Sequence, residues 1–140
     1  TLMHPNQNRL IIDAGTCITY DFVNEKNQYL GGAISPGIKI RYKSLNDYTS
    51  KLPLLTLNDD FNIIGNSTKS AIHSGVINGV IFEIDGFISQ YYLKNQDLTI
   101  ILTGGDADFL AKRLKSTIFA NSNFLLESLN LLSLYTHQND

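Results

Sequence analysis

The alternation of apolar and polar positions predicts three consecutive strands near the start of the chain. Leu10–Asp13, Cys17–Val23 and Tyr29–Ile34 are rich in β-branched, aromatic and other apolar residues. A Gly-Thr pair separates the first two segments, and the polar stretch 24–28 separates the second from the third. We therefore expect an antiparallel meander of three strands.

Helical spacing follows this meander. After Ser35-Pro36-Gly37, apolar residues recur every three or four positions to about Thr49, and Pro53 ends this pattern. The stretch 54–64 is predicted to be a loop. A longer helix is expected after Asn66-Ser67-Thr68, because apolar residues keep a helical spacing from Ile72 to Tyr91. Gly75 and Gly79 lie on one ridge of this helix, so we expect another element to pack there.

The second half of the chain predicts a strand, a glycine turn and a helix. Leu98–Thr103 is continuously apolar, Gly104-Gly105-Asp106 follows it, and helical spacing then runs from Ala107 to Leu114. The leucine-rich stretch 124–134 predicts an edge strand that turns into a last helix, with a frayed tail from Thr136. The whole order predicts one α/β domain over residues 1–140, with a mixed, ribonuclease H-like sheet that begins with three antiparallel strands and carries packed helices.

Composition narrows the function classes. At 140 residues with 43% hydrophobic content, the chain can form one ordinary core. A net charge of -2 gives no basic excess, so we expect no nucleic-acid partner. We expect no membrane association, because the chain shows neither a long apolar run nor a signal peptide. Cys17 is the single cysteine, which fits a cytoplasmic protein, and its place in a strand predicts a small core residue.

Asp13, Gly15, Thr16 and Thr19 form the first candidate site. A glycine lets the backbone approach a phosphate, a threonine hydroxyl donates to phosphate oxygens, and a carboxylate at a strand end can hold a cation against them. The alternative is an ordinary hairpin in which Asp and Gly only satisfy the geometry of the turn. An ionised carboxylate at the end of an apolar strand favours the site, because its desolvation needs compensation.

Gly104 and Gly105 form the second candidate site, at a junction between a strand and a helix. The N–H groups of the helix start can receive an anion, or the glycines can pack against a flat base. A tight connection with Asp106 as helix cap explains the same residues. Gly31-Gly32 is more simply a bulge than a ligand wall, and Thr68 is more simply a helix cap than a ligand contact.

Other residues carry less information. His4, His73 and His137 share no spacing that would form a zinc site, so they are interpreted as surface or packing residues. Arg41 and Lys43 are interpreted as solvated helix charges, although either could meet an anion. The Gly-x-x-x-x-Gly-Lys-Ser/Thr loop is absent, which excludes a P-loop nucleotidase.

Motifs along nearly the whole chain together resemble the type III pantothenate kinases. The motifs are Asp13-Ala-Gly-Thr-Cys-Ile-Thr-Tyr-Asp21, Gly31-Gly-Ala-Ile-Ser-Pro-Gly37, Arg41, Leu52-Pro53, Gly65-Asn-Ser-Thr68 with Ile72 and Gly75, and Thr103-Gly-Gly105. That family belongs to the acetate and sugar kinase, Hsp70 and actin superfamily, in which two ribonuclease H-like domains face each other across a nucleotide cleft. Its members phosphorylate pantothenate from ATP in the first step of coenzyme A synthesis.

The resemblance implies separate roles for the candidate residues. Asp13 would hold a monovalent cation, potassium or ammonium, and Thr16 with Gly15 would contact ATP, which is used together with magnesium. Gly104 and Gly105 would lie near the nucleotide base. Thr68 would contact pantothenate, across the interface of a homodimer built in part by the long helix.

The family's N-terminal phosphate motif and its Gly-x-Asp-Arg motif, which holds the catalytic base, do not occur in this sequence. The chain is therefore expected to match the C-terminal domain alone and to have no catalytic residue and no kinase activity of its own. Two alternatives stay open. One is a noncatalytic regulator of the same superfamily, and the other is a kinase whose acceptor is a sugar.

Overall fold

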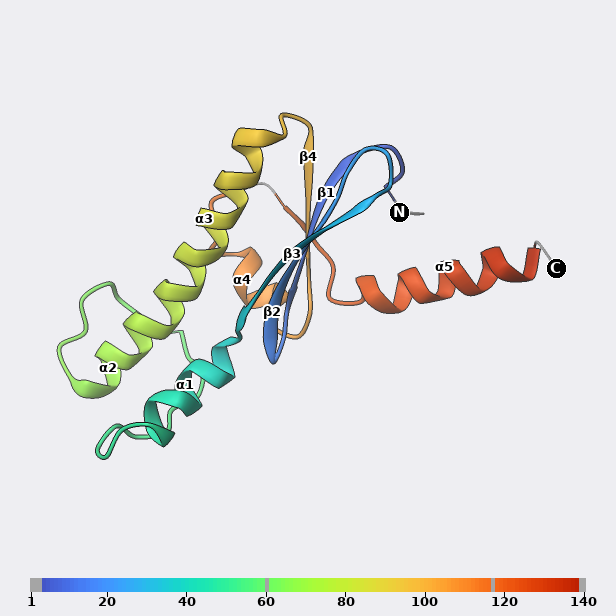
Figure 1. The fold of residues 1–140 in the computed structure, drawn as a ribbon. Helices are drawn as coiled ribbons and strands as arrows, with labels where there is room; N and C mark the ends of the chain where they lie inside the picture. Colours follow the sequence, from blue (N-terminus) through green and yellow to red (C-terminus); the bar gives the residue numbers. More distant parts are fainter. Residues whose placement is uncertain (1–3, 60, 117, 139–140) are drawn as a thin grey trace.

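The computed structural model describes residues 4–59, 61–116 and 118–138, with only the backbone for residues 119, 137 and 138. Three strands come first, helical segments follow, and strands and helices alternate only from β4 onward (Figure 1). The elements are β1 (Asn8–Ala14), β2 (Cys17–Val23), β3 (Tyr29–Pro36), α1 (Ile38–Asp47), α2 (Thr68–His73), η1 (Ser74–Asn78), α3 (Gly79–Lys94), β4 (Leu98–Thr103), α4 (Ala107–Ala111), β5 (Phe119–Ala120) and α5 (Phe124–Gln138).

The strands form one mixed sheet of five strands in the order β3-β2-β1-β4-β5. The pairs β1–β2 and β2–β3 are antiparallel, which confirms the predicted meander. The meander is only one side of the sheet, however, because β4 pairs in parallel with β1 and β5 in parallel with β4. The first strand of the chain therefore lies in the centre of the sheet.

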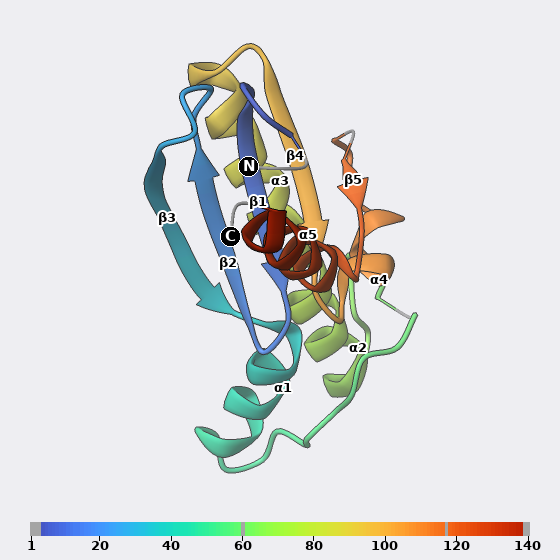
Figure 2. The ribbon, with the colours of Figure 1, turned by 90° about the vertical axis from the view of Figure 1, so that its right-hand side faces the viewer.

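One face of the sheet is buried under the long helix. Burial alternates along β1 and β2, with Leu10 opposite Phe22 and Ile12 opposite Tyr20 on the buried face. The ring of Phe87 stacks on Tyr20 with centroids 4.1 Å apart. Figure 2 shows α3 running behind this face, and the buried residues of α3 complete the core there. The period of two in the strands and of 3.6 in the helix therefore produces the expected two-layer packing.

The opposite face of β1 and β2 carries the polar residues. Asp13 lies opposite Thr19, and Ile11 lies opposite Asp21. Cys17 lies on this side as well and is exposed, so the prediction of a core cysteine is wrong. The alternation of the strand explains the error, since the neighbouring Ile18 takes the buried position.

The predicted long helix is present, but it contains one π-helical segment. Residues 68–94 form a continuous helical run in which η1 interrupts the α-helical hydrogen bonding. Ser74 donates from Oγ to the carbonyl of Ile63 at 2.7 Å, and Asn78 donates from Nδ2 to the carbonyl of Phe61 at 3.1 Å. These bonds attach the 54–64 segment to the wider turn. π-Helical turns of this kind are frequent at functional sites.

The same run, Thr68–Lys94, meets the length and composition of a membrane span, with a mean hydropathy of 1.3. Half of its apolar window is buried inside the structure, and core helices of globular proteins pass the same test. The hydropathy of this helix is therefore explained by its packing on the sheet.

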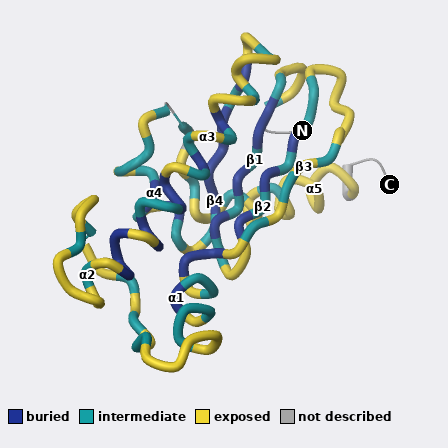
Figure 3. The backbone as a smooth tube through the Cα atoms, turned by 60° about the vertical axis from the view of Figure 1, so that its left-hand side comes forward, coloured by how far each residue is buried: buried dark blue, intermediate teal, exposed yellow. Residues whose placement is uncertain are grey.

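The remaining elements differ from the prediction at their boundaries. α4 ends at Ala111, short of Leu114, and the stretch predicted to begin as an edge strand is helical from Phe124. The edge strand is β5, which lies just before it. α5 extends away from the sheet and includes Thr136 (Figure 1). Figure 3 shows α5 as largely exposed, in agreement with the exposed leucines along it.

A bulge is confirmed in β3. The pairing of β2 with β3 shifts between Phe22 and Val23, where Gly31 faces Phe22 and Tyr29 faces Val23. Gly31 has φ +100, which a glycine adopts without strain.

Candidate functional site

Asp13 and Gly104 meet at the ends of the paired strands β1 and β4. Asp13 is aligned with Thr103 in the parallel ladder, so Gly104 comes directly beside it. A Cβ at Gly104 would lie 2.5 Å from Oδ1 of Asp13 and 2.5 Å from the carbonyl oxygen of Ala14. Gly104 also has φ +98. Only glycine therefore satisfies both the conformation and the space at this position.

The Gly15-Thr16 turn is held from two sides. On one side, Asp106 donates its backbone N–H to the carbonyl of Ala14 at 3.0 Å. On the other, Gly37 donates its backbone N–H to the carbonyl of Thr16 at 3.0 Å, and a Cβ at Gly37 would lie 2.1 Å from the carbonyl oxygen of Gly15. The two glycine motifs that are distant in sequence thus fix the same turn.

A cavity of about 400 Å³ opens beside this turn, and we call it the turn cavity. Lys39 and Asp106 are its charged residues, and Thr16, Thr56 and Tyr42 carry hydroxyl groups. The full lining is Gly15, Thr16, Ile38, Lys39, Tyr42, Leu55, Thr56, Leu57, Gly105 and Asp106. The structure therefore brings Gly15, Thr16 and Gly105 to one cavity, with Gly104 adjacent to them through Asp13.

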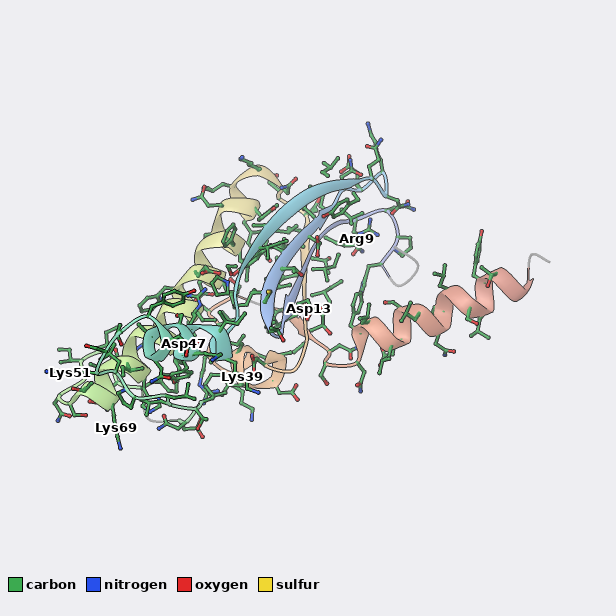
Figure 4. The ribbon with its side chains drawn as sticks, turned by 60° about the horizontal axis from the view of Figure 1, so that its bottom comes forward. Arg9, Asp13, Lys39, Asp47, Lys51 and Lys69 are labelled. Atoms are coloured by element: carbon green, nitrogen blue, oxygen red, sulfur yellow. The ribbon has the colours of Figure 1, made fainter. Side chains whose placement is uncertain are left out.

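Lys39 is the cavity residue that sequence reasoning missed. It follows the Pro36-Gly37 break on the first turn of α1, where the sequence analysis considered only Arg41 and Lys43 as anion contacts. Lys39 lies two residues after Gly37, the glycine that packs on the Gly15-Thr16 turn. This spacing is the sequence feature that could have identified it as a cavity residue. Figure 4 shows Asp13 near one end of β1, with Lys39 on nearby α1, while Arg9 lies toward the other end of the strand.

Asp106 is the N-cap residue of α4, as the alternative role proposed, but its side chain makes no capping hydrogen bond. Burial raises the pKa of its carboxyl, and the charge of Lys39 partly offsets this increase. The turn cavity therefore holds one acidic and one basic side chain, Asp106 and Lys39.

A chain of hydrogen bonds that begins at the buried Tyr42 supports the wall of the turn cavity. The hydroxyl of Tyr42 lies 2.7 Å from Nδ1 of His73, and Nε2 of His73 lies 3.1 Å from Nδ2 of Asn58. Burial raises the pKa of Tyr42 to about 12. His73 is therefore a packing residue, as expected, with both ring nitrogens in use. The side chain of His137 lies outside the described residues.

Oxygen atoms converge on one side of the turn. Oδ1 of Asp13 and the carbonyl oxygen of Ala14 each lie 2.5 Å from the same point above Gly104. Within the described part of the chain, no three residues among His, Cys, Asp and Glu come together as a metal-binding group. A carboxylate and a carbonyl are oxygen donors, which suit a hard cation rather than zinc.

Thr68 lies in a second cavity of about 650 Å³, which we call the helix cavity. Its lining is Arg41, Ser44, Leu45, Leu52, Thr68, Ala71, Ile72, Gly75 and Val76. Helix α1 separates the two cavities, since Lys39 and Tyr42 line one and Arg41 and Ser44 line the other. Thr16 and Thr68 are therefore not brought into the same cavity.

The alternative in which Thr68 caps the long helix is not observed, because another of the three candidate residues 66–68 takes that position. Ser67 is the N-cap, and its Oγ accepts a hydrogen bond from the backbone N–H of Ser70 at 3.1 Å. Ser70 returns the interaction, because its Oγ accepts from the backbone N–H of Ser67 at 2.9 Å. This capping box satisfies the helix start and leaves the Thr68 side chain available to the helix cavity.

The expected packing against Gly75 and Gly79 is only partly observed. A Cβ at Gly75 would meet nothing within 4 Å, and Gly75 lines the helix cavity. A Cβ at Gly79 would lie 3.9 Å from Nη1 of Arg41. Within the described residues, the glycine ridge therefore borders open space and one arginine.

Comparison with known proteins decides between the families that this site allows. The family model described as type III pantothenate kinase matches residues 1–90. The chain belongs to this family. A type III pantothenate kinase of Flavobacterium johnsoniae is 64% identical over 140 residues, which cover 100% of this chain and 57% of the relative. That of Cytophaga hutchinsonii is 43% identical over 133 residues, which cover 95% of this chain and 57% of the relative.

The chain thus spans about half the length of the type III pantothenate kinases it matches. Among solved structures, a Campylobacter jejuni protein assigned to the Baf family of transcriptional activators matches with a TM-score of 0.66 and 22% identity. The match covers 94% of this chain and 60% of that chain. At this identity the likeness concerns the fold alone.

Proposed function

We propose that this chain is the C-terminal, ribonuclease H-like domain of a type III pantothenate kinase. The whole protein would transfer the γ-phosphoryl group of ATP to pantothenate, the first step of coenzyme A synthesis. One observation carries the proposal: Asp13, the Gly15-Thr16 turn and Gly104-Gly105 converge at one end of the sheet in a chain of this family. The strand order, with an antiparallel meander beside parallel strands, supports the ribonuclease H-like assignment.

The turn cavity is the proposed nucleotide site. The hydroxyl of Thr16 would donate a hydrogen bond to the phosphates of ATP, and Lys39 would add positive charge. Gly15 donates its own backbone N–H to the carbonyl of Cys17 at 3.0 Å, so its part would be to let the phosphates approach a backbone without a side chain. Gly104 and Gly105 would lie against the base. The close approach of Gly104 to Asp13 means that the base and the phosphate ends of the site share one rigid support.

Asp13 is the proposed ligand of a monovalent cation, potassium or ammonium, together with the carbonyl oxygen of Ala14. When bound, such a cation would offset the negative charge of the ATP phosphates, which bring magnesium with them. The carboxylate of Asp13 would determine where the cation binds, because Oδ1 of Asp13 lies close to both Gly15 and Gly104.

The helix cavity is the proposed acceptor site, with Thr68 as a contact to pantothenate. The cavity is open and is lined by Gly75, whose missing side chain leaves room for a second molecule. We propose that a homodimer covers it, so that the long helix of one subunit helps to enclose the acceptor.

No catalytic base is assigned within this chain. Phosphoryl transfer depends on groups placed on both sides of the phosphate, and this chain matches about half the length of its relatives. We therefore propose that the chain alone has no kinase activity. The single cysteine is consistent with a cytoplasmic location for the whole enzyme.

The test uses the full-length protein with ATP, magnesium and a potassium salt, and follows formation of phosphopantothenate by mass. We expect product with pantothenate and none with a panel of sugars and N-acetyl sugars. Transfer to a sugar alone would replace the proposal by a sugar kinase. Absence of transfer to every acceptor would favour a noncatalytic regulator.

A further inference from the structure

Arg41 is held by a network of hydrogen bonds that centres on Glu83. The carboxylate of Glu83 accepts hydrogen bonds from the hydroxyl of Tyr20 at 2.7 Å, from the hydroxyl of Ser35 and from Nη2 of Arg41. Arg41 also donates from Nε to the carbonyl of Pro36 at 2.9 Å. Two of its three nitrogens are therefore fixed by β3 and α3, and the guanidinium plane has one orientation.

The third nitrogen of Arg41 is left for another partner. Within the described part of the chain, Nη1 makes no hydrogen bond, and it lies 3.9 Å from where a Cβ of Gly79 on α3 would be. Arg41 lines the helix cavity together with Thr68 and Ser44. The side chain as a whole is about one-fifth exposed, at 21%, so the charge of Arg41 is not fully desolvated.

The chemistry of the helix cavity defines what it can bind. Arg41 is the one charged residue of its lining, Ser44 and Thr68 carry hydroxyls, and the rest is aliphatic or glycine. An arginine recognises a carboxylate through directed N–H donors, and an aliphatic lining favours a branched hydrocarbon group. The cavity therefore suits a small acid with an apolar body and hydroxyl groups.

We propose that Arg41 is a specificity-determining residue, whose Nη1 binds the carboxylate of the acceptor in the helix cavity while Glu83 positions the guanidinium. This inference rests on the proposed function, in which pantothenate occupies the cavity beside Thr68. Pantothenate carries one carboxylate, two hydroxyls and a dimethyl group, which match the three kinds of lining. Glu83 itself is a positioning residue, because its own carboxylate points to donors of the protein.

Lys43 provides a matched control on the same helix. It forms an exposed i,i+4 pair with Asp47 at 2.8 Å and does not line the helix cavity. The loss of a positive charge from α1 can therefore be separated from the loss of the Arg41 contact.

The experiment compares Arg41→Gln, Arg41→Lys and Lys43→Gln in the full-length enzyme, with pantothenate and with pantothenol, in which an alcohol replaces the carboxylate. We expect Arg41→Gln to raise the KM for pantothenate about 10- to 100-fold, the range for a lost hydrogen bond to a charged group. The KM for pantothenol and for ATP should change less than about twofold, and Lys43→Gln should match the wild type. Arg41→Lys should give an intermediate KM, since it keeps the charge and loses the planar fork.

Glu83→Gln tests the positioning role. We expect a higher KM for pantothenate with kcat and the KM for ATP unchanged. Equal increases for pantothenate and pantothenol in Arg41→Gln would overturn the inference, because a structural role moves both. An unchanged KM for pantothenate in Arg41→Gln would overturn it as well, while leaving the proposed kinase activity intact. A wild-type protein without pantothenate kinase activity would refute both.

Discussion

Oδ1 of Asp13 lies where a side chain on Gly104 would begin, 2.5 Å from its Cβ position, although 91 residues separate the two in the chain. The parallel pairing of β1 with β4 creates this contact, because it aligns Asp13 with Thr103. The proposed cation ligand and the proposed base-binding turn are therefore one structural unit.

Gly104→Ala is expected to damage this unit. The substitution places a methyl group against Asp13 and requires a side chain at φ +98, so it should lower the free energy of unfolding by about 1–3 kcal/mol. It should also raise the KM for ATP. Thermal unfolding and steady-state kinetics of the full-length protein measure both effects.

The adjacent Gly105→Ala is the control for this prediction. A Cβ at Gly105 would meet nothing within 4 Å, and its φ is not positive. We expect its melting temperature to stay close to that of the wild type. Equal destabilisation by both substitutions would contradict the described packing.

Ser67 and Thr68 should separate stability from binding. Ser67→Ala removes the N-cap, so we expect a loss of about 1 kcal/mol of stability with an unchanged KM for pantothenate. Thr68→Val keeps the cap and removes a hydroxyl from the helix cavity, so we expect the reverse pattern. Chemical unfolding and steady-state kinetics of both variants distinguish the two patterns. A loss of stability in Thr68→Val alone would contradict this prediction, because it would indicate that Thr68 is the cap.

Glu83 should make stability depend on acidic pH. Burial alone would raise the pKa of its carboxyl, but hydrogen bonds from Ser35, Arg41 and Tyr20 outweigh burial and lower the pKa below the usual glutamate value. A lowered pKa in the folded state means that the stabilisation is complete above the pKa of an unfolded glutamate, near 4.5. It is lost as the pH falls through the lower pKa of the folded state.

Melting temperatures of wild type and Glu83→Gln between pH 7 and pH 3 test this, with Asp47→Asn as a control in an exposed pair. We expect Glu83→Gln to be less stable at neutral pH, by about 1–3 kcal/mol for a charged hydrogen bond. The gap to wild type should narrow toward the acid end. A gap that stays constant with pH would contradict an ionised Glu83 in the folded state.

The local pattern was sufficient to predict most elements but not their contacts. Period-two alternation located the three strands of the meander, and helical spacing located α1 and the long helical run. The same alternation, read with its phase, would have placed Cys17 on the exposed side, as the buried Ile18 shows. The π-helical segment was not predictable, because Ser74 and Asn78 bond to a loop that has no periodicity.

The parts of the candidate site that were predictable are the two glycine turns, each of which is formed by a short continuous motif. Gly15, Thr16 and Gly105 line a common cavity because strand ends meet at one edge of a sheet. Lys39 and the Arg41–Glu83 pair were not predicted, since their roles depend on which side of α1 faces which cavity. The sequence left three adjacent candidates for the N-cap, residues 66–68, and only the backbone geometry selects Ser67.

The central claim is that the Gly15-Thr16 turn is the nucleotide half of a pantothenate kinase site. Its most direct test is the KM for ATP of the full-length enzyme in pantothenate phosphorylation, with Thr16→Val compared with Thr99→Val, a residue of β4 that lines neither the turn cavity nor the helix cavity. We predict an increase of about 10-fold or more for Thr16→Val, from the loss of a hydrogen bond to a charged phosphate, and a wild-type KM for Thr99→Val. An unchanged KM for ATP in Thr16→Val would contradict the account.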